Sequence, residues 1–445
     1  MKVEFTGQSA RDADNIQANP SRLVNCYREV VQSGGKSGHV LKSVPGLASF
    51  AAVAGVFVRC LEEVGGDLYT SCNGAFVKIA SSGAVTILGS VTDGENATVA
   101  GNNGSIGLVI GGAYRVWDGA TLLTPTPGQF SAFGSVDYIG SYSVLTQLGG
   151  NEFCWSDVAA PQTLPALNFT SADGRDDKII RGMAISGQYV VFKEKSHEIW
   201  YVTGDSGAKA FDRQAGGVID VGLMAFNLLC RVPGGGAFYV GSDGKVRVIG
   251  LQSPVSIPPV ETAIATKIPE FCIAYEDEGH TFCAITFSDA PAWVYDLSSG
   301  EWHERAQGAE LGPWKASVSA KMAGVWYAGR DGGEILSFGR TNSDGGLPLV
   351  RRAVSRTIAP GKRFVLSEVE VFPRIGFDPG TVELTVSKDG GHTWGAPKAR
   401  SWSVGEYGKR INWRALGQFR NAVLQIQISD PIECPINAEG NVNAA

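Results

Sequence analysis

HTFCAITFSDAPAWVYDLSSGEWHE, residues 280–304, is the stretch that decides the fold class. Its apolar residues fall into short runs, and these runs are separated by Ser-Asp-Ala-Pro and by Ser-Ser-Gly. Short runs rich in Val, Tyr, Phe and Trp between such turns are typical of antiparallel hairpins. This stretch therefore predicts consecutive β-strands rather than a helix.

Similar hairpins recur along the chain at a regular distance. Their first strands start at Leu68, Gly107, Tyr142, Tyr189, Phe238, Phe282 and Trp326, with gaps of 39, 35, 47, 49, 44 and 44 residues. A repeat of this length built from hairpins indicates a β-propeller, because one four-stranded blade needs about 40–50 residues and must bury its faces against neighbouring blades. We expect an all-β chain with six or seven blades, six preferred. A large array of β-sandwiches is the alternative, but it does not predict the regular spacing.

The composition agrees with a folded protein that has many turns. Glycine accounts for 58 of the 445 residues, charged residues for only 18%, and the chain has ten Trp. A disordered chain is richer in charge and poorer in aromatic residues. No run of about 18 apolar residues occurs, and the first residues lack the apolar core of a signal peptide, so we expect no membrane insertion and synthesis inside a cell.

The residues that usually carry chemistry form no recognisable site. The eight Cys include no Cys-x-x-Cys pair, and the five His have no metal-ligand spacing, so we expect free thiols, no metal and no cofactor. The sequence also lacks the phosphate-binding loop, the dinucleotide-binding fingerprint and the Gly-x-Ser-x-Gly nucleophile motif. We therefore expect no catalytic residues.

The chain divides into four parts on the basis of its patterns. We expect an N-terminal arm or platform segment over 1–50, the propeller over 51–350, a C-terminal β-sandwich-like platform module over 351–431 and a loose polar tail over 432–445. The charge changes at the third part. Residues 1–350 carry 25 basic and 35 acidic residues, residues 351–420 carry 13 and 6, and the remaining 25 residues add three acids, which together give the net charge of −6.

The basic part of the sandwich module is a candidate assembly interface. Its basic residues are interleaved with aromatic ones, and Arg and Trp are the side chains that dominate protein interfaces. The same combination suits a nucleic-acid surface, which is the less favoured alternative. The candidate residues are Arg351, Arg352, Arg356, Trp402, Lys409, Arg410, Trp413, Arg414 and Arg420.

The segment SKDGGHTWG, residues 387–395, matches the Asp-box pattern. We expect its residues to build a structural turn in which side chains bind the backbone, a glycine takes a positive φ, and the Trp packs back onto the hairpin as a buried side chain. The residues of this turn are Ser387, Asp389, Gly391, Thr393 and Trp394. Asp-boxes also occur on sialidase propellers, but the single copy and its place outside the blades argue against a catalytic role.

Three segments resemble a known family of short-tailed bacteriophages. They are SRLVNCYREVV (21–31) with LKSVPGLASF (41–50), then IIRGMAISGQYVVFKEKSHEIWYVTGD (179–205) with GVIDVGLMAFN (217–227), and finally LTVSKDGGHTWG (384–395) with GEYGKRINWRALGQFRNAVLQIQISDP (405–431). In these segments the chain is similar to the packaged-DNA stabilization proteins, also called tail hub or nozzle proteins. The closing segment carries the most specific likeness.

The resemblance implies a structural virion protein of the phage tail that is assembled in the host cytoplasm. It implies a homo-hexameric ring below the portal and its adaptor, which continues the DNA channel, retains the genome and docks the tail needle, tailspikes or tail fibres for DNA ejection. Genomic DNA would pass the lumen without sequence-specific binding. An acidic body agrees with this, because duplex DNA carries one charge per ~1.7 Å and a basic wall would hold it. The alternative is a β-propeller tail protein that binds or cleaves host surface sugars.

Overall fold

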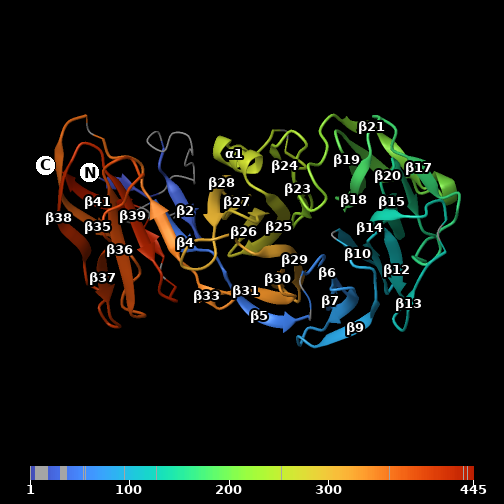
Figure 1. Cartoon of the computed structure of the whole chain (residues 1–445), viewed down its shortest axis with the longest axis horizontal. Helices are drawn as coiled ribbons and strands as arrows, with labels where there is room; N and C mark the ends of the chain where they lie inside the picture. The colour runs from blue at the N-terminus through green and yellow to red at the C-terminus, as the bar shows by residue number, and fades with distance from the viewer. Residues whose placement is uncertain are drawn as a thin grey trace.

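The computed structural model describes residues 2–5, 19–30, 38–53, 55, 57–94, 96–126, 128–251, 253–359, 361–433, 435–437 and 439–444. Of the expected N-terminal arm, residues 1, 6–18 and 31–37 lie outside the described residues, as do 434, 438 and 445 of the expected tail. The molecule is elongated, with a ring of sheets at one end and a sandwich that carries both termini at the other (Figure 1).

The first four sheets of the ring are antiparallel and follow one another along the chain. They consist of β6 (Glu62–Val64), β7 (Asp67–Cys72), β8 (Ala75–Ile79) and β9 (Val85–Ser90); β10 (Ala97–Asn102), β11 (Ser105–Ile110), β12 (Ala113–Trp117) and β13 (Leu122–Leu123); β14 (Phe133–Ile139), β15 (Tyr142–Gln147), β16 (Glu152–Trp155) and β17 (Phe169–Ser171); and β18 (Ile179–Ile185), β19 (Gln188–Lys193), β20 (His197–Val202) and β21 (Phe211–Ile219). In each sheet the chain starts at the strand nearest the axis of the ring, so every sheet is one blade.

Three further sheets complete the ring. They consist of β22 (Leu229–Arg231), β23 (Ala237–Val240) and β24 (Val246–Val248); β25 (Pro269–Asp277), β26 (His280–Phe287), β27 (Ala292–Asp296) and β28 (Glu301–Arg305); and β29 (Ala316–Met322), β30 (Val325–Arg330), β31 (Glu334–Gly339) and β5 (Gly46–Ala52). The propeller thus has six four-stranded blades and, between β21 and β25, a three-stranded sheet over which helix α1 (Pro258–Thr266) packs. The predicted all-β propeller is confirmed.

The ring is closed by a strand from the start of the chain. β5 pairs with β31 as the outer strand of the last blade, and β29 lies against β6 of the first blade. The turn between β30 and β31 needs glycine, because Gly333 has a φ of 75° and a Cβ there would collide with the carbonyl oxygen of Val53. β5 crosses the boundary that we expected at residue 50, since this strand belongs to the propeller although it precedes the other blades in the chain.

Neighbouring blades are joined at their inner strands by side chains that bind the next strand's backbone. The Thr98 hydroxyl accepts from the Val136 amide at 2.8 Å, and the Ser135 hydroxyl accepts from the Gly182 amide at 3.0 Å. Ser319 binds both the amide and the carbonyl group of Ala274. These bonds satisfy backbone groups that face the axis and have no strand partner.

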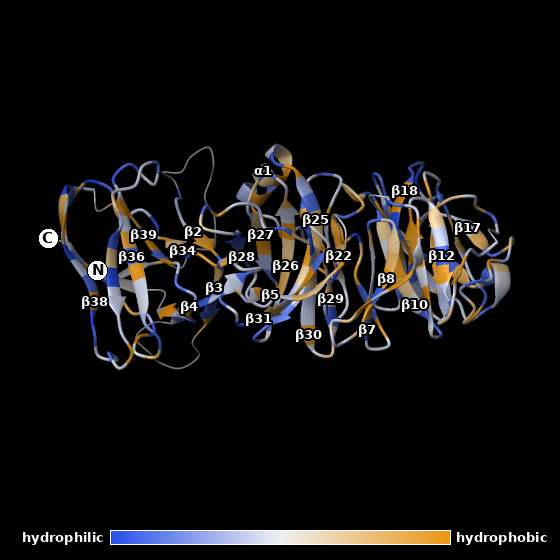
Figure 2. Ribbon diagram, turned by 60° about the horizontal axis from the view of Figure 1, so that its bottom comes forward, coloured by the Kyte–Doolittle hydropathy of each residue, from blue (hydrophilic) through white to orange (hydrophobic). Residues whose placement is uncertain are grey.

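The C-terminal part is a two-layer sandwich, as expected. One layer is the sheet β1 (Lys2–Glu4), β41 (Glu439–Ala444), β35 (Phe364–Val371) and β38 (Ile411–Phe419); the other contains β2 (Arg22–Val24), β34 (Arg351–Val354), β39 (Val423–Ile428), β36 (Gly380–Ser387) and β37 (Lys398–Trp402). Buried residues of both layers, among them Leu366, Leu384 and Leu424, form one core. Figure 2 shows hydrophobic stretches along the strands of both the sandwich and the propeller.

The segment that we expected to be a loose tail contributes two strands instead. β41 pairs with both β1 and β35, and β40 (Ile436–Asn437) pairs with β4 (His39–Ser43), which follows β3 (Cys26–Val30). A polar segment can still be ordered because its backbone groups complete two sheets. The remaining short elements are η1 (Gly207–Lys209), β32 (Ser343–Asp344) and β33 (Leu347–Pro348).

The propeller and the sandwich share one sheet of nine strands. β28 of a blade is followed by β2, in parallel, and then by β34, β39, β36 and β37. The Arg22 guanidinium binds the Glu304 carboxylate at 2.6 and 2.7 Å between β2 and β28. The negative charge of Glu304 raises the pKa of Arg22. The sandwich is therefore attached through a continuous sheet rather than through a flexible linker.

All described cysteines are free thiols, and six of these seven are buried. In the described ranges, no group of three or more Cys, His, Asp or Glu could hold a metal ion. No helix of the described chain is long and apolar enough to cross a membrane.

Candidate functional site: the basic end of the sandwich and the axial cavity

The Asp-box turn has the hydrogen bonds that its residues predict. The Ser387 hydroxyl donates to Asp389 at 2.7 Å and accepts from the Gly391 amide at 2.8 Å. The Asp389 carboxylate accepts from the Thr393 amide at 2.9 Å and from its hydroxyl at 2.5 Å. These hydrogen bonds, led by that from Ser387, hold the pKa of Asp389 well below its usual range. The turn is thus closed on itself, which fits a structural role.

Trp394 differs from the expectation of a buried side chain. It is partly exposed and lies at a small hollow with Arg22, Arg352 and Gln425. Arg352 on β34 is followed by Ala353, and Gln425 on β39 is followed by Ile426. Ala353 and Ile426 point into the sandwich core, so Arg352 and Gln425 lie on the opposite face of the sheet. Trp394 therefore covers the outer face of the nine-stranded sheet, because the hairpin folds back over that face and not into the space between the layers.

Four of the candidate interface residues lie inside the module. Trp402 and Trp413 are only 2% and 1% exposed and belong to the sandwich core. Arg351 is buried as well, and its guanidinium donates to the carbonyl oxygens of Asp430 and Ile432. Arg352 is partly buried and binds the Gln427 side chain at 2.7 and 3.0 Å. The aromatic residues were misjudged as surface anchors because their spacing fits an inward-facing strand position equally well.

The other five candidates lie on the surface. Arg356, Lys409, Arg410, Arg414 and Arg420 are all exposed. Arg410 binds Glu370 at 2.7 and 3.0 Å, which raises the pKa of Arg410, and Arg414 reaches Glu368 at 3.3 Å. The side chains of Arg410 and Arg414 nevertheless remain 59% and 70% exposed, so both can also contact a partner.

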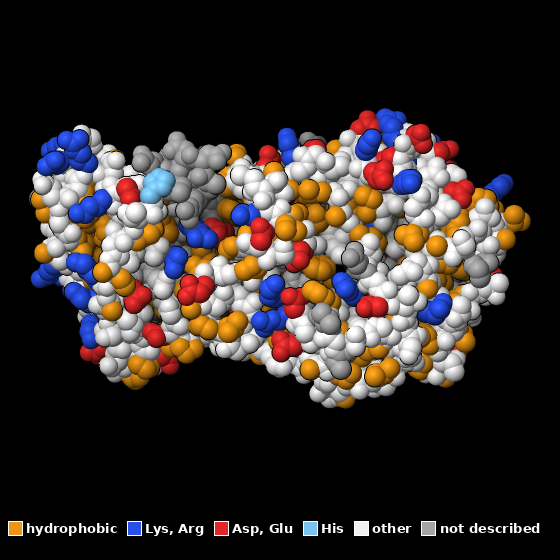
Figure 3. All heavy atoms as spheres, viewed as in Figure 1, with side chains coloured by type: hydrophobic (Ala, Val, Ile, Leu, Met, Phe, Trp, Pro, Cys, Tyr) orange, Lys and Arg blue, Asp and Glu red, His pale blue; other side chains and the backbone are white. Residues whose placement is uncertain are grey.

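The exposed basic residues gather at the end of the molecule that lies opposite the propeller. β38 and β37 are edge strands of the two layers there, and they meet each other. Lys398 and Arg400 of β37 are exposed and extend the set, although sequence reasoning missed them. Figure 3 shows Lys and Arg side chains along this end of the sandwich. Side chains already bind part of the backbone at these edges, since Arg400 donates to the Asn412 carbonyl oxygen at 2.9 Å and the Trp413 indole donates to the Lys398 carbonyl oxygen at 2.6 Å, so positive charge is the main feature of this end.

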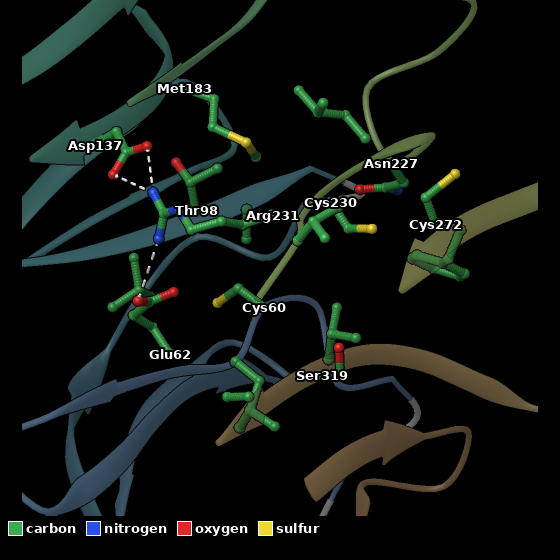
Figure 4. A pocket seen from close by; sticks show the side chains of 18 of the residues that line it. Cys60, Glu62, Thr98, Asp137, Met183, Asn227, Cys230, Arg231, Cys272 and Ser319 are labelled. Atoms are coloured by element: carbon green, nitrogen blue, oxygen red, sulfur yellow. Dashed lines mark hydrogen bonds and ion pairs between the residues drawn. The ribbon is translucent and has the colours of Figure 1, made fainter. Parts of the chain in front are cut away.

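A second candidate site is a cavity of about 390 Å³ on the axis of the propeller. Every sheet of the ring contributes lining residues from its innermost strand (Figure 4). The walls combine apolar side chains and thiols with charged groups. The charged residues are Arg59, Glu62, Glu63, Asp137, Arg181, Arg231 and Lys321.

Arg231 connects the three-stranded sheet with two of the blades. Its guanidinium binds the Asp137 carboxylate at 2.8 Å and lies 3.6 Å from the Glu62 carboxylate (Figure 4). Asp137 raises the pKa of Arg231, whereas burial raises the pKa of Glu62 to about 7. Asp137 also accepts from the Ala184 amide at 2.8 Å. The axis is therefore bridged by side chains.

Arg181 is a further cation of this cavity, and its surroundings differ. It donates to the carbonyl oxygens of Phe226 and Leu229, both at 3.2 Å, and its guanidinium lies over the Phe226 ring. Burial lowers its pKa. Sequence reasoning missed this cluster. The available signal was a single Arg inside an apolar run, in IIRGM and in LLCRV.

Two family models match the chain in order. The model described as bacteriophage P22 Gp10, beta-propeller, matches residues 4–336, and the model described as bacteriophage P22 Gp10, beta-sandwich, matches residues 356–440. No curated protein matches the sequence.

Several solved structures are similar to part of this chain at low identity. PorZ, a surface component of the type-IX secretion system of Porphyromonas gingivalis, is 10% identical with a TM-score of 0.41, and the match covers 64% of this chain and 37% of PorZ. Raptor of Chaetomium thermophilum is 9% identical with a TM-score of 0.44, over 66% of this chain and 29% of Raptor. YCF48 bound to a D1 peptide is 10% identical with a TM-score of 0.42, over 66% of this chain and 99% of that one.

Proposed function

We propose that this chain, which belongs to the family of bacteriophage P22 Gp10, forms a homo-hexameric ring that continues the DNA channel below the portal and its adaptor. The family consists of structural proteins of the short-tailed phage tail that stabilise packaged DNA, and its place is the virion. The ring would assemble in the host cytoplasm, dock the tail needle, tailspikes or tail fibres, and have no enzymatic activity.

The closed axis of the propeller is the observation that supports the proposed hexameric ring. The major groove of B-DNA alone is about 8.5 Å deep, so a duplex is at least about twice as wide. A cavity of about 390 Å³ that is bridged by Arg231 cannot pass such a duplex. DNA can therefore pass only through a channel that several copies of the chain form together. Identical chains usually assemble with closed symmetry, and a closed ring of copies provides such a channel.

The charges support an ordered contact between copies or with an acidic partner. Residues 1–350 have ten more acids than bases, whereas residues 351–420 have seven more bases than acids. Contact between the basic end of the sandwich and an acidic surface is favourable and speeds association. The acidic part would line the channel, because a basic wall would hold the phosphate backbone.

Complementation of DNA-filled heads that lack this protein tests the proposal. We expect wild-type protein to prevent DNA leakage, and the double variant Arg410→Glu/Arg414→Glu to remain folded but fail to do so. Arg175→Glu is the control, since Arg175 is an exposed arginine of the propeller that likewise forms an ion pair, with Asp220. Equal retention of DNA by the double variant and wild type would exclude the basic end as the docking surface.

A cryo-EM map of the tail vertex tests the ring itself. We expect six copies around a lumen lined mainly by acidic or neutral side chains. A lumen lined mainly by Lys and Arg, or a single copy at the vertex, would overturn the proposed channel.

The alternative function is a sugar-binding or sugar-cleaving tail protein. The propeller and the Asp-box favour it, but the Asp-box is a closed turn in the sandwich module. Turnover of capsule, lipopolysaccharide or sialoside substrates by the pure protein, abolished by one carboxylate substitution, would establish this alternative.

A further inference from the structure

A small hollow, here named the outer hollow, lies on the outer face of the nine-stranded sheet beside the Asp-box hairpin. Val354 of β34 is buried at its base and stands directly opposite Arg22 of β2 on one side and Gln425 of β39 on the other. Arg352 lies two residues before Val354 and therefore on the same face. Figure 2 shows β2, β34 and β39 side by side. The other lining residues are Pro20, Gly391 and Trp394.

Both arginines of the outer hollow keep one nitrogen free. Arg22 binds Glu304 through Nε and Nη2, at 2.7 and 2.6 Å. Arg352 binds the side-chain oxygen of Gln427 through its own Nε and Nη2, at 3.0 and 2.7 Å. Nη1 of either arginine has no hydrogen-bond partner among the residues that the structure describes, and neither atom is fully enclosed. The two guanidinium groups therefore offer donors that solvent reaches.

Gln425 and Trp394 add further unused donors. The Gln425 amide and the Trp394 indole form no hydrogen bond within the described part of the chain, and neither group is fully enclosed. No carboxylate lines the hollow, and the neighbouring Asp-box turn adds no net charge there, because Lys388 and Asp389 offset each other. Several N–H donors without an acceptor around one hollow favour an oxyanion as the occupant.

The charges at the outer hollow add up to one positive unit. Arg22 and Glu304 neutralise each other, whereas Arg352 has only the neutral Gln427 as its partner. Burial and the charge of Arg22 lower the pKa of Arg352, and Glu304 offsets only part of this effect. The next acid on this face, Glu383, lies two strands away from Arg352, beyond Gln427. An anion in the hollow would relieve the repulsion between the two arginines.

We propose that the outer hollow binds a phosphate group, which accepts hydrogen bonds from Arg22, Arg352 and Gln425. The hollow measures about 50 Å³, and a single water occupies about 10–15 Å³ of such space, so a group of a few heavy atoms fits. The donors come from three neighbouring strands and from the hairpin. A phosphate presents oxygens in four directions, whereas a carboxylate presents two in one plane, and arginine is a preferred partner of phosphate. This inference concerns one copy of the chain and does not depend on the ring.

Inorganic phosphate is the probe for the first experiment. Calorimetric titration and thermal unfolding of the full chain at pH 7 are followed with phosphate, with acetate, and with sodium chloride at equal ionic strength. We expect phosphate to bind with a Kd of about 1 mM or lower and to raise the unfolding temperature. Acetate should bind at least about tenfold more weakly, because its two oxygens reach fewer of the donors.

A phosphomonoester distinguishes the two sources of the phosphate group. Glucose 6-phosphate that binds as well as inorganic phosphate would show that the site recognises the phosphate group alone. Tighter binding of glucose 6-phosphate would show that a larger molecule carries the phosphate and also contacts Trp394, the partly exposed side chain at the hollow. Both results support the site, and glucose without a phosphate should not bind.

Substitutions then assign the site. Arg352→Gln should weaken phosphate at least about tenfold, and Arg352→Lys should restore part of the affinity. Gln425→Glu places an acid in the hollow and should abolish binding. Arg356→Gln is the control, since Arg356 is an exposed arginine just after β34 that does not line the hollow. If these variants fail to fold, a crystal structure of the wild type with arsenate, which has the shape of phosphate, locates the arsenic atom.

Four results would overturn the proposal. They are no binding of phosphate at up to about 50 mM, far above the expected Kd, an effect of phosphate no larger than that of sodium chloride, unchanged affinity in folded Arg352→Gln and Gln425→Glu variants, or an arsenic atom outside the outer hollow.

Discussion

Asn25 connects the segment that follows β28 of the propeller with the segment that precedes β34 of the sandwich. It is fully buried with a left-handed φ of 55°, and its side-chain amide donates to the carbonyl oxygens of Ala306 and Val350 at 2.9 and 2.8 Å. Its side-chain oxygen accepts from the Ala306 amide at 2.9 Å. We expect Asn25→Ala to lower the free energy of unfolding by about 3 kcal/mol, because three backbone groups lose their partners in a dry environment. Urea denaturation measures this loss.

Asn103→Ala is the matched control for Asn25→Ala. Asn103 has a similar φ of 49° but is exposed and donates only to the Ala159 carbonyl oxygen at 3.1 Å. Its replacement by Ala carries the same backbone strain without the buried hydrogen bonds, so we expect a loss below about 1 kcal/mol. Equal losses in the two variants would mean that the backbone conformation, and not the buried hydrogen bonds, is what Asn25 contributes.

His280 links the same region through charge. It binds Asp296 at 2.7 Å and Glu29 at 2.9 Å, and these contacts, led by the one with Asp296, raise its pKa to about 8. Because the folded pKa lies above the ordinary 6.5, protonated His280 stabilises the fold fully below pH 6.5, and this contribution is lost as the pH rises through about 8. We expect His280→Gln to remove about 1 kcal/mol of this pH dependence, after allowance for solvent screening.

The measurement for His280 is the free energy of unfolding between pH 6 and pH 9, compared with wild type at each pH. The comparison is needed because Glu62, with a pKa of about 7, titrates in the same range. His392→Gln is the control, since His392 is exposed on the Asp-box turn. Parallel pH profiles for His280→Gln and wild type would exclude this contribution.

At the scale of elements, two tryptophans of the sandwich module, Trp413 and Trp394, differ in what they stabilise. Trp413 of β38 is 1% exposed and its indole donates to the Lys398 carbonyl oxygen at 2.6 Å, which joins β38 to β37. Trp394 is partly exposed on the outer face. We expect Trp413→Ala to cost about 3–5 kcal/mol and Trp394→Ala about 1 kcal/mol in urea denaturation. A larger loss for Trp394→Ala would contradict the position of the Asp-box hairpin described above.

The strands of the blades were predictable because their signals are local. Each of the seven hairpin starts lies in the second strand of a different sheet, and the expected turn Ser298-Ser299-Gly300 falls between β27 and β28. The closing strand β5 was not predictable, because nothing in residues 46–52 says that their partner lies in β31, almost 290 residues away. The burial of Trp402 and Trp413 was missed for a related reason: an alternating strand with an aromatic residue does not say which of its faces meets the second layer.

At the scale of the whole molecule, the sequence revealed the charge asymmetry but not its geometry. Arg231, Asp137 and Glu62 come from three different sheets of the propeller and meet only because these sheets form a closed ring, so no spacing along the chain predicts the cluster. The family likeness, in contrast, was visible in SRLVNCYREVV. The structure shows what this segment does in the fold: Arg22 and Arg28 bind acidic residues of β28, and Asn25 binds the backbone directly after β28.

The continuous nine-stranded sheet leads to a prediction about cooperativity. The two parts that match separate family models share β2, which pairs with β28 of a blade and with β34 of the sandwich. β4 also pairs with β40, and β1 with β41, so the sandwich depends on the start of the chain. We expect the full chain to unfold in one cooperative calorimetric transition, with equal calorimetric and van't Hoff enthalpies.

Fragments provide the control for this cooperativity. A fragment of residues 351–445 lacks β1, β2 and β4, and a module of this size has little buried surface to spare. We expect it to remain unfolded by circular dichroism and by amide-proton NMR dispersion, and a fragment of residues 1–350 to unfold at a lower temperature than the full chain, because the edge of β2 that pairs with β34 is then open. Arg22→Ala in the full chain should split the single transition into two, since this side chain binds Glu304 across the join. Two separate transitions already in the wild type, or a folded 351–445 fragment, would show that the shared sheet connects the two parts without coupling their stability.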